Sequence, residues 1–357
     1  MIDLKEKYLK DKHVWDECSK DYEIQIVGGH PDITAFEKFE EDFLDRILSF
    51  LALNQERPIK LMDIGCGSGR LHLRYGAKTA EISGLLEKTK IHKLKSDNPD
   101  FYNDPLLSEK LVEVWGIDFS KKMINLAKQK IKNAGLDKYN RILLNFEEGS
   151  AFDLQEQSKD ILPVAVCLVN SIGVMQGTEG AKELFRSMRR AVESSNGIAI
   201  ISCYEKEHIE TYGLGQYEST LDVSGQPAWL EPDAYASIKF KQIPRYYICA
   251  NKPQKKLLVD VFDEKGKLLV ENHVLKRNIK KTKKVVSSGH IETYSDYESN
   301  WYSFEQIQEW MNKYWMSMGY HIHAKEIDIL RARPAQLAIF DPNNLLEDFF
   351  KEWGILA

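Results

Sequence analysis

Two kinds of hydrophobic pattern alternate along the first two thirds of the chain. Short apolar runs, which are typical of buried strands, lie before Asp63 and at residues 111–117, 142–146, 164–169 and 198–203. Apolar residues between them recur at helical spacing. Strands that alternate with covering helices predict a doubly wound parallel sheet of the α/β class. Residues 322–330 and 336–340 read as a final antiparallel pair, so we expect a seven-stranded, mostly parallel sheet.

Several helices have recognisable starts. Ser120 precedes a stretch whose apolar residues share one helical face, and we expect it to cap that helix. Residues 181–192 form a second amphipathic covering helix. Thr34 with Glu37, and the pair at 303 and 306, have the spacing of a capping box.

Two stretches interrupt the alternation. The distance from Asp63 to Asp118 exceeds the roughly 20 residues that a compact unit needs, so residues 78–110 include an insertion. Residues 213–297 contain two strand-like runs around a turn at 263–266, which predict a β-hairpin within a small antiparallel β subdomain. The expected units are a main domain of residues 1–212 and 298–341, the β insertion of residues 213–297, and a C-terminal tail helix in residues 342–357.

A glycine-rich turn is the strongest chemical signal. Residues 61–71 read Leu-Met-Asp-Ile-Gly-Cys-Gly-Ser-Gly-Arg-Leu, an apolar strand ending in an acid and a turn that opens onto a helix. Glycine lets the backbone bend sharply and lie against a ligand, and the helix start offers unpaired N–H groups. Arg70 stands where a dinucleotide turn needs glycine, and no Gly-Lys-Ser/Thr follows as in a P-loop. The alternative is a tight turn that binds no ligand.

This turn resembles motif I of the class I S-adenosylmethionine (SAM)-dependent methyltransferases of small molecules, and residues 116–123 are similar to their second motif. The resemblance implies SAM as the cofactor, with its ribose bound by Asp118, the position of the ribose acid in dinucleotide folds. It implies that Asp63 orders water or the methionine end. Ser150 departs from the acid or amide common at that place. The implied cofactor-binding residues are Asp63, Gly65, Cys66, Gly67, Gly69, Asp118, Phe119, Met123, Ser150, Ala151, Phe152, Asn170 and Ser171.

The resemblance also supplies candidates for the reacting end of the site. The catalytic candidates, which would line the mouth of the methyl-donor site, are Tyr22, Asn170 and Tyr204. The acceptor-binding candidates, which flank the roots of the β insertion, are Glu205, His208, Trp301 and Tyr302. For Tyr22, a plain core aromatic on a helix is an equally good interpretation. No metal-ligand cluster is recognisable in the sequence.

Composition narrows the class of protein. The chain has 357 residues, 43% hydrophobic and 29% charged, which is typical of a soluble globular protein. Its net charge of -5 gives no general attraction to nucleic acid or to an anionic membrane. The five cysteines are scattered without a CxxC pair, against a disulfide framework or zinc site. With no membrane-length apolar run and no signal-peptide pattern, we expect a cytoplasmic protein.

Methyl transfer from a sulfonium needs mainly positioning and exclusion of water. A neutral amine acceptor needs no strong base, whereas a hydroxyl does, and no lysine–acid pair stands at a strand end. We therefore expect an amine or an already acidic acceptor, with N- favoured over O-methylation, and the resemblance implies that the acceptor is a small molecule.

Other functions stay open. The basic run at residues 276–284 could bind RNA in an RNA methyltransferase, although a lysine-protected edge strand is the favoured interpretation. The chain could also be a non-catalytic SAM-binding scaffold, or an aminopropyl transferase on the same fold. The β insertion is expected either to roof the acceptor pocket or to form a homodimer contact.

Overall fold

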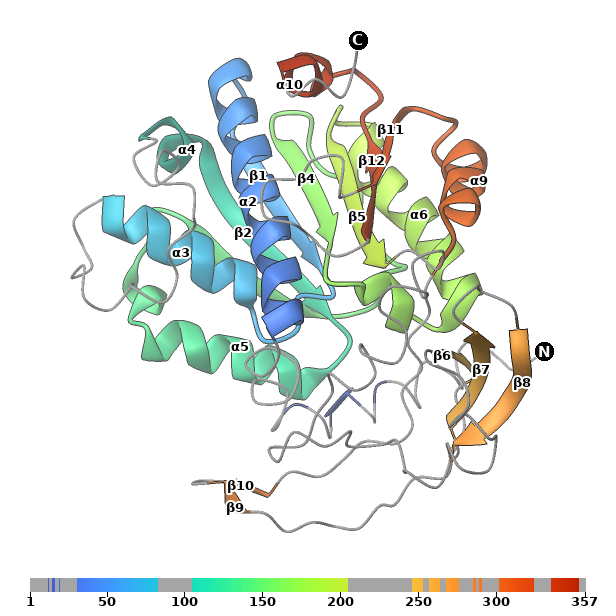
Figure 1. Cartoon of the computed structure of the whole chain (residues 1–357). Coiled ribbons are helices and arrows are strands. Elements are labelled where there is room, and N and C mark those ends of the chain that lie inside the picture. The colour runs from blue at the N-terminus through green and yellow to red at the C-terminus, as the bar shows by residue number, and fades with distance from the viewer. Residues whose placement is uncertain are drawn as a thin grey trace.

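A seven-stranded sheet forms the centre of the molecule (Figure 1). It is seen in a computed structural model that describes residues 12, 15, 16, 19, 31–82, 105–204, 246–252, 257–263, 268–275, 285–286, 289–290, 302–323 and 335–352. The strands are β1 (Ile59–Ile64), β2 (Leu111–Asp118), β3 (Leu143–Glu148), β4 (Leu162–Cys167), β5 (Ile198–Tyr204), β11 (Gly319–His323) and β12 (Ala335–Phe340).

The order of the strands across the sheet is β3-β2-β1-β4-β5-β12-β11. Strands β1 to β5 are parallel, and β12 is antiparallel to both of its neighbours. The chain order reverses between β1 and β4, and the crevice beyond the carboxyl ends at such a switch point is where open α/β sheets bind ligands. The predicted seven-stranded, mostly parallel sheet of the α/β class is confirmed.

Helices cover both faces of this sheet (Figure 1). One layer contains α2 (Pro31–Asn54), α3 (Arg70–Ile82) and α5 (Lys121–Asn133), with α4 (Pro105–Lys110) and α10 (Glu347–Glu352) beside α2. The other layer contains α6 (Gly177–Glu193) and α9 (Phe304–Tyr314). Within the described ranges, no helix is both long and apolar enough to cross a membrane.

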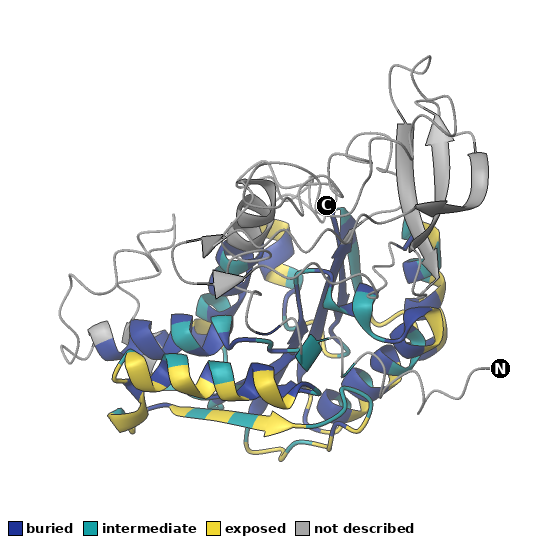
Figure 2. Ribbon diagram, turned by 90° about the horizontal axis from the view of Figure 1, so that it is seen from below, coloured by how far each residue is buried: buried dark blue, intermediate teal, exposed yellow. Residues whose placement is uncertain are grey.

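Successive strand residues point to opposite helical layers, and the two layers are packed differently. Toward α2 the inner strands present large side chains, including Val164, Val166, Ile198 and Ile200. Toward α6, several positions of β4 and β5 present small side chains: Ala165, Cys167, Ala199 and Cys203. The helices on that side supply the volume: Phe185 and Trp315 have ring centroids 4.4 Å apart, and Trp315 Nε1 donates to Phe185 O at 2.8 Å. Strand β3 is an exposed edge (Figure 2).

The predicted helix starts have mixed outcomes. Ser120 Oγ accepts from Met123 N at 3.2 Å, so it caps α5 as predicted. Ser303 and Gln306 form the predicted capping box at the start of α9, with hydrogen bonds of 3.0 and 2.9 Å. The capping box at Thr34 is wrong, because α2 begins at Pro31. Proline suits a first helical position, where its missing N–H would have no intrahelical partner.

Two strand boundaries also differ from the prediction. Strand β4 ends at Cys167 rather than at residue 169, since Val169 has a φ of +54° and leaves the strand conformation. Strand β11 begins at Gly319, three residues earlier than expected, after a turn in which Met316 and Ser317 have positive φ. A Cβ at Gly319 would lie 1.9 Å from Ile339 O, so only glycine allows this close pairing.

Two smaller sheets come from the region of the β insertion. Strands β6 (Tyr246–Lys252), β7 (Leu257–Asp263) and β8 (Leu268–Leu275) form an antiparallel sheet, which confirms the predicted hairpin. Strands β9 (Val285–Val286) and β10 (Gly289–His290) pair separately. The basic run at 276–284 lies outside the described residues. Of the predicted insertion at 78–110, the structure describes the parts in α3 and α4, and residues 83–104 are outside it.

Two glycines with nearly equal φ allow the cost of backbone strain to be distinguished from the cost of a crowded Cβ. Gly69 and Gly135 have φ of +78° and +72°; a Cβ at Gly69 would lie 3.0 Å from Ala127 Cβ, whereas one at Gly135 meets nothing within 4 Å. We expect Gly135→Ala to lower the free energy of unfolding by about 1 kcal/mol, and Gly69→Ala to lower it by about twice that. Urea unfolding measures both. Equal losses would show that crowding at Gly69 is relieved without penalty.

Candidate cofactor-binding site

The candidate site lies along the edge of the sheet where the parallel strands end. Asp63 and Asp118 stand at the ends of β1 and β2, and Asn170 follows the end of β4. Parallel strands place their carboxyl ends on one side, so these residues share an edge although they are far apart in the sequence.

The glycine turn after β1 is held by backbone hydrogen bonds to β2. Gly65, Gly67 and Gly69 have φ of +77°, +50° and +78°, a conformation that glycine adopts without a Cβ clash. The N–H groups of Gly65 and Cys66 donate to Ile117 O at 2.8 and 3.1 Å. A Cβ at Gly65 would lie 2.9 Å from Met175 Cε, so this glycine also allows the turn to lie against the loop after β4.

Asp118 connects the glycine turn to helix α5. Its Oδ2 accepts from Gly67 N at 2.9 Å, and its Oδ1 accepts from Ser120 N at 2.8 Å. Burial raises the pKa of Asp118 to about 6, while the two backbone donors act in the opposite direction. Each carboxylate oxygen has more than one lone pair, so the group can accept further hydrogen bonds from a ligand.

A cleft opens above the glycine turn, with about 690 Å³ of empty space including its open mouth. The lining is mostly apolar with few polar groups, and it consists of Trp15, Gly65, Gly67, Ile117, Asp118, Phe119, Met123, Gly149, Ser150, Ala151, Phe152, Ser171, Val174, Met175 and Gln176. Such a surface suits a flat, partly apolar ligand that carries a few hydrogen-bonding groups.

The N-terminal segment contributes Trp15 to this lining. The neighbouring Asp16 Oδ1 accepts from Ser120 Oγ at 2.7 Å and from Lys122 N at 3.2 Å, so it binds the start of α5. Lys12 forms an ion pair with Glu148 at the end of β3. These contacts fix Trp15 beside the cleft.

The loop after β4 has an unusual backbone. Val169 and Asn170 have φ of +54° and +55°, and both are non-glycine residues. This conformation is rare for a β-branched side chain, and residues held in it cost of order 1–3 kcal/mol each unless their surroundings determine them. The turn leads directly into a short 3₁₀ helix (Ser171–Val174), which supplies part of the cleft wall.

Buried acids and a buried histidine surround this edge of the sheet. Burial raises the pKa of Glu40 and of Asp63 to about 7, and Arg70 partly offsets the effect at both. His72 is fully buried, its pKa is lowered to about 3 by burial, and its ring is therefore neutral at neutral pH. His72 Nε2 is 3.0 Å from Asn145 O, which assigns the proton to Nε2 and leaves Nδ1 3.9 Å from Asp63 Oδ2.

Most of the predicted cofactor-binding residues meet at the cleft. Those that line it are Gly65, Gly67, Asp118, Phe119, Met123, Ser150, Ala151, Phe152 and Ser171. Asp63, Cys66, Gly69 and Asn170 do not line it. Cys66 packs on Gly116 of β2, and Gly69 lies against α5 near Ala127. Asn170 and Asp63 are buried, with 4% and 6% of their surface exposed.

The reacting end of the site is less completely described. Tyr22, Glu205, His208 and Trp301 lie outside the described residues. For Tyr204 the structure describes the backbone, which pairs with Ala335 at the end of β5. Tyr302 is 2% exposed and packs edge-on against Trp310 at 4.9 Å, so it is a core aromatic and not part of the cleft lining.

Sequence reasoning missed part of the lining. Several residues that line the cleft were not predicted from the sequence: Trp15, Ile117, Gly149, Val174, Met175 and Gln176. Ile117 and Gly149 adjoin selected residues, so their positions beside Asp118 and Ser150 were the available signal. No sequence signal marked the lining residues after Ser171, because their approach to the cleft depends on the turn at Val169 and Asn170.

Comparison with known proteins agrees with this geometry. Residues 105–224 match a family model described as a methyltransferase domain. This match begins after the glycine turn, so the turn is an independent observation. No curated protein matches the chain.

Among solved structures, similar ones include a SAM-dependent methyltransferase from Clostridium acetobutylicum, with 10% identity, a TM-score of 0.41, and 91% of this chain and 97% of that chain covered. Another is from Methanosarcina mazei, with 11% identity, a TM-score of 0.40, and coverage of 80% and 92%. A third is the magnesium protoporphyrin IX methyltransferase from Synechocystis with bound SAH, with 15% identity, a TM-score of 0.38, and coverage of 69% and 91%.

The sheet has a Rossmann-like strand order with a single antiparallel strand inserted before the edge, and residues 105–224 match a methyltransferase domain.

The raised pKa of Asp63 predicts a specific pH dependence. An acid whose pKa is raised on folding favours the folded state when protonated, so its contribution to stability is lost as pH rises from about 4 through about 7. An asparagine in place of this residue would mimic the protonated acid. We expect Asp63→Asn to be more stable than wild type at pH 8, by on the order of a few kcal/mol, and equal to it near pH 4.

Urea unfolding of the ligand-free protein at both pH values tests this expectation. Asp153→Asn, the same substitution at an exposed loop acid, is the control. A constant difference between Asp63→Asn and wild type at the two pH values would contradict the prediction.

Proposed function

We propose that the cleft binds SAM and that the protein transfers its methyl group to a small-molecule acceptor, more readily an amine than a hydroxyl. The observation that carries this proposal is the link between Asp118, at the end of β2, and the N–H of Gly67 in the glycine turn, at the floor of an apolar cleft. A carboxylate at this place can accept hydrogen bonds from both hydroxyls of a ribose.

The residues of the cleft fit the parts of this cofactor. Gly65 and Gly67 line the cleft without side chains, which leaves their backbone accessible to a ligand. Phe119, Met123 and Phe152 offer apolar surface for a purine ring. Ser150 can contribute a hydroxyl at the adenine edge, although its Oγ already accepts from Phe152 N at 3.1 Å.

SAM, when bound, supplies a methyl group that its sulfonium already activates. The chain's own share is therefore to hold the two reactants in line and to exclude water. Of the described lining residues, Asp118 is the one with an ionisable side chain, and in this proposal its oxygens bind the ribose as well as Gly67 and Ser120, which leaves no base for the acceptor. A hydroxyl acceptor needs a base at its proton, so this lining favours an amine.

Calorimetric titration tests the cofactor. We expect SAM and SAH to bind the wild type with micromolar affinity, on the order of -8 kcal/mol. Asp118→Ala should weaken both by about a hundredfold, because it removes a charged acceptor and releases the glycine turn. Asp153→Ala, an exposed acid on the adjoining loop, is the matched control and should bind as wild type does. A folded wild type that binds neither ligand would refute the proposal.

Turnover distinguishes an enzyme from a non-catalytic scaffold. Panels of small amines and hydroxyl compounds, followed by release of SAH, should give product with amines first. SAM binding without turnover on either panel would favour the scaffold, and turnover on hydroxyl compounds alone would refute the preference for nitrogen.

A further inference from the structure

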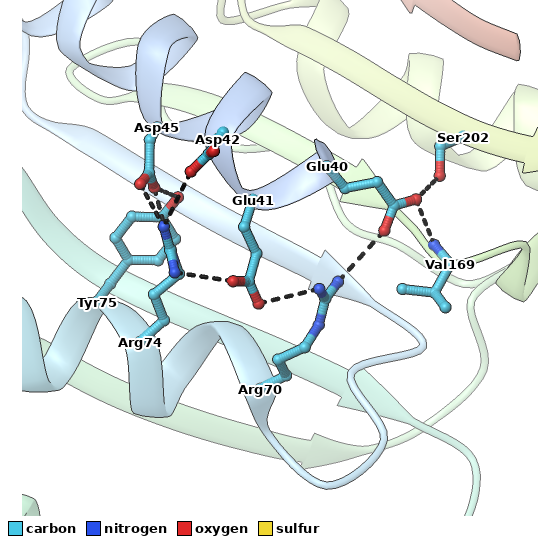
Figure 3. Close-up of polar contacts among 9 residues, drawn as sticks. All are labelled: Glu40, Glu41, Asp42, Asp45, Arg70, Arg74, Tyr75, Val169 and Ser202. Atoms are coloured by element: carbon cyan, nitrogen blue, oxygen red, sulfur yellow. Dashed lines mark hydrogen bonds and ion pairs between the residues drawn. The ribbon is translucent and has the colours of Figure 1, made fainter. Parts of the chain in front are cut away.

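A buried glutamate on a covering helix connects both sides of the cleft. Glu40 lies on α2, is 1% exposed, and contacts three other segments (Figure 3). Its Oε1 accepts from Val169 N at 2.7 Å and from the hydroxyl of Ser202 on β5. Its Oε2 is 3.5 Å from Arg70 Nη2, at the start of α3 directly after the glycine turn. Neither motif of the methyltransferase resemblance includes this residue.

Glu40 contacts Val169 at a point where the backbone has an unfavourable conformation. Val169 and Asn170 are consecutive non-glycine residues with positive φ. A left-handed conformation at a β-branched residue persists only where the surrounding structure determines it. A side-chain oxygen of Glu40 accepts from the N–H of the first of these residues at 2.7 Å, and a buried N–H left without an acceptor is costly.

The turn that Glu40 supports positions one wall of the cleft. Ser171, Val174 and Met175 follow it and line the cleft. This wall touches the glycine turn, because a Cβ on Gly65 would be 2.9 Å from Met175 Cε and 3.4 Å from Ser171 Cβ. A displaced turn at Val169 would therefore move groups that lie directly against the glycine turn.

We propose that Glu40 is a positioning residue for the cofactor cleft, which acts through the backbone N–H of Val169 to hold the turn after β4. The inference rests on the proposed function of that cleft in binding SAM. It requires an acceptor oxygen that reaches Val169 N; the ion pair with Arg70 is secondary.

Three substitutions at Glu40 test whether the site needs an oxygen that reaches Val169 N or a negative charge. Glu40→Gln keeps an oxygen at the same reach without the charge, Glu40→Asp keeps the charge on a shorter side chain, and Glu40→Ala removes both. By calorimetry, we expect Glu40→Gln to bind SAM and SAH within about threefold of wild type, and Glu40→Asp and Glu40→Ala to bind about tenfold or more weakly. The opposite order, with Asp tolerated and Gln not, would assign the role to the ion pair and overturn the proposal.

Asp45→Ala is the matched control for general destabilisation. Asp45 is on the same helix, is fully buried, and accepts from Tyr75 Oη and Lys78 Nζ of α3 at 2.8 and 2.9 Å, away from the turn after β4. We expect it to lower Tm at least as much as Glu40→Ala, with its Kd for SAM within about twofold of wild type. A loss of affinity in Asp45→Ala that matches the loss in Glu40→Ala would reduce Glu40 to a structural role.

A glycine substitution at Val169 adds a rescue test. Glycine adopts positive φ without strain, so Val169→Gly in the Glu40→Ala background should recover at least part of the lost affinity. Affinity that stays as low as in Glu40→Ala would contradict action through the turn.

A wild type that binds no SAM would refute the proposed function of the cleft. The positioning role of Glu40 can still be tested in that case. Hydrogen exchange of the ligand-free protein should then show faster exchange at residues 168–171 in Glu40→Ala and Glu40→Asp, and unchanged exchange there in Glu40→Gln. Unchanged exchange in all three variants would overturn the positioning role. Should Glu40→Ala fail to fold, the comparison of Glu40→Asp with Glu40→Gln decides the question.

Discussion

The hydrogen bonds of Asp118 are the constraint on which the candidate site depends. Its side chain accepts from Gly67 in the turn after β1 and from Ser120 at the start of α5, and its carbonyl oxygen accepts from Gly149 after β3, at 3.0 Å. One residue at the end of β2 therefore fixes three segments that form the walls of the cleft. The arrangement is possible because β1, β2 and β3 are parallel neighbours whose carboxyl ends share one edge.

Between α2 and α3 lies a layer of buried ion pairs, in contrast to the apolar core beneath it. Glu41 and Asp45 are one helical turn apart on α2 and face Arg74 of α3, with Arg74 Nη1 2.8 Å from Glu41 Oε2 and Arg74 also paired with Asp45 (Figure 3). Burial lowers the pKa of Lys78 to about 7 despite the nearby Asp45. Buried ion pairs add little net stability, but removing one partner costs about 3–5 kcal/mol. We infer that this layer holds α2 against α3.

Local patterns in the sequence were sufficient for most of the fold. The strands and the covering helices were predictable because each inner strand buries both faces and each helix buries one. The errors came where a tertiary contact overrides the local pattern. Val169 has the side chain of a strand residue, yet its N–H turns toward Glu40 and the strand ends earlier. The start of β11 was misplaced because Gly319, which lies before the expected strand at 322–330, allows close approach to Ile339.

The difference between local sequence patterns and tertiary contacts also explains which parts of the site could be predicted. Gly65, Gly67 and Asp118 were found because their roles impose residue types at a nearly fixed spacing. Glu40 had no such signal: the acidic stretch on α2 has the composition of a solvated helix face, and its burial depends on arginines that come later, on α3. A strained turn and the group that stabilises it are coupled in space and not in sequence, so neither residue reveals the other until the helix is placed on the sheet.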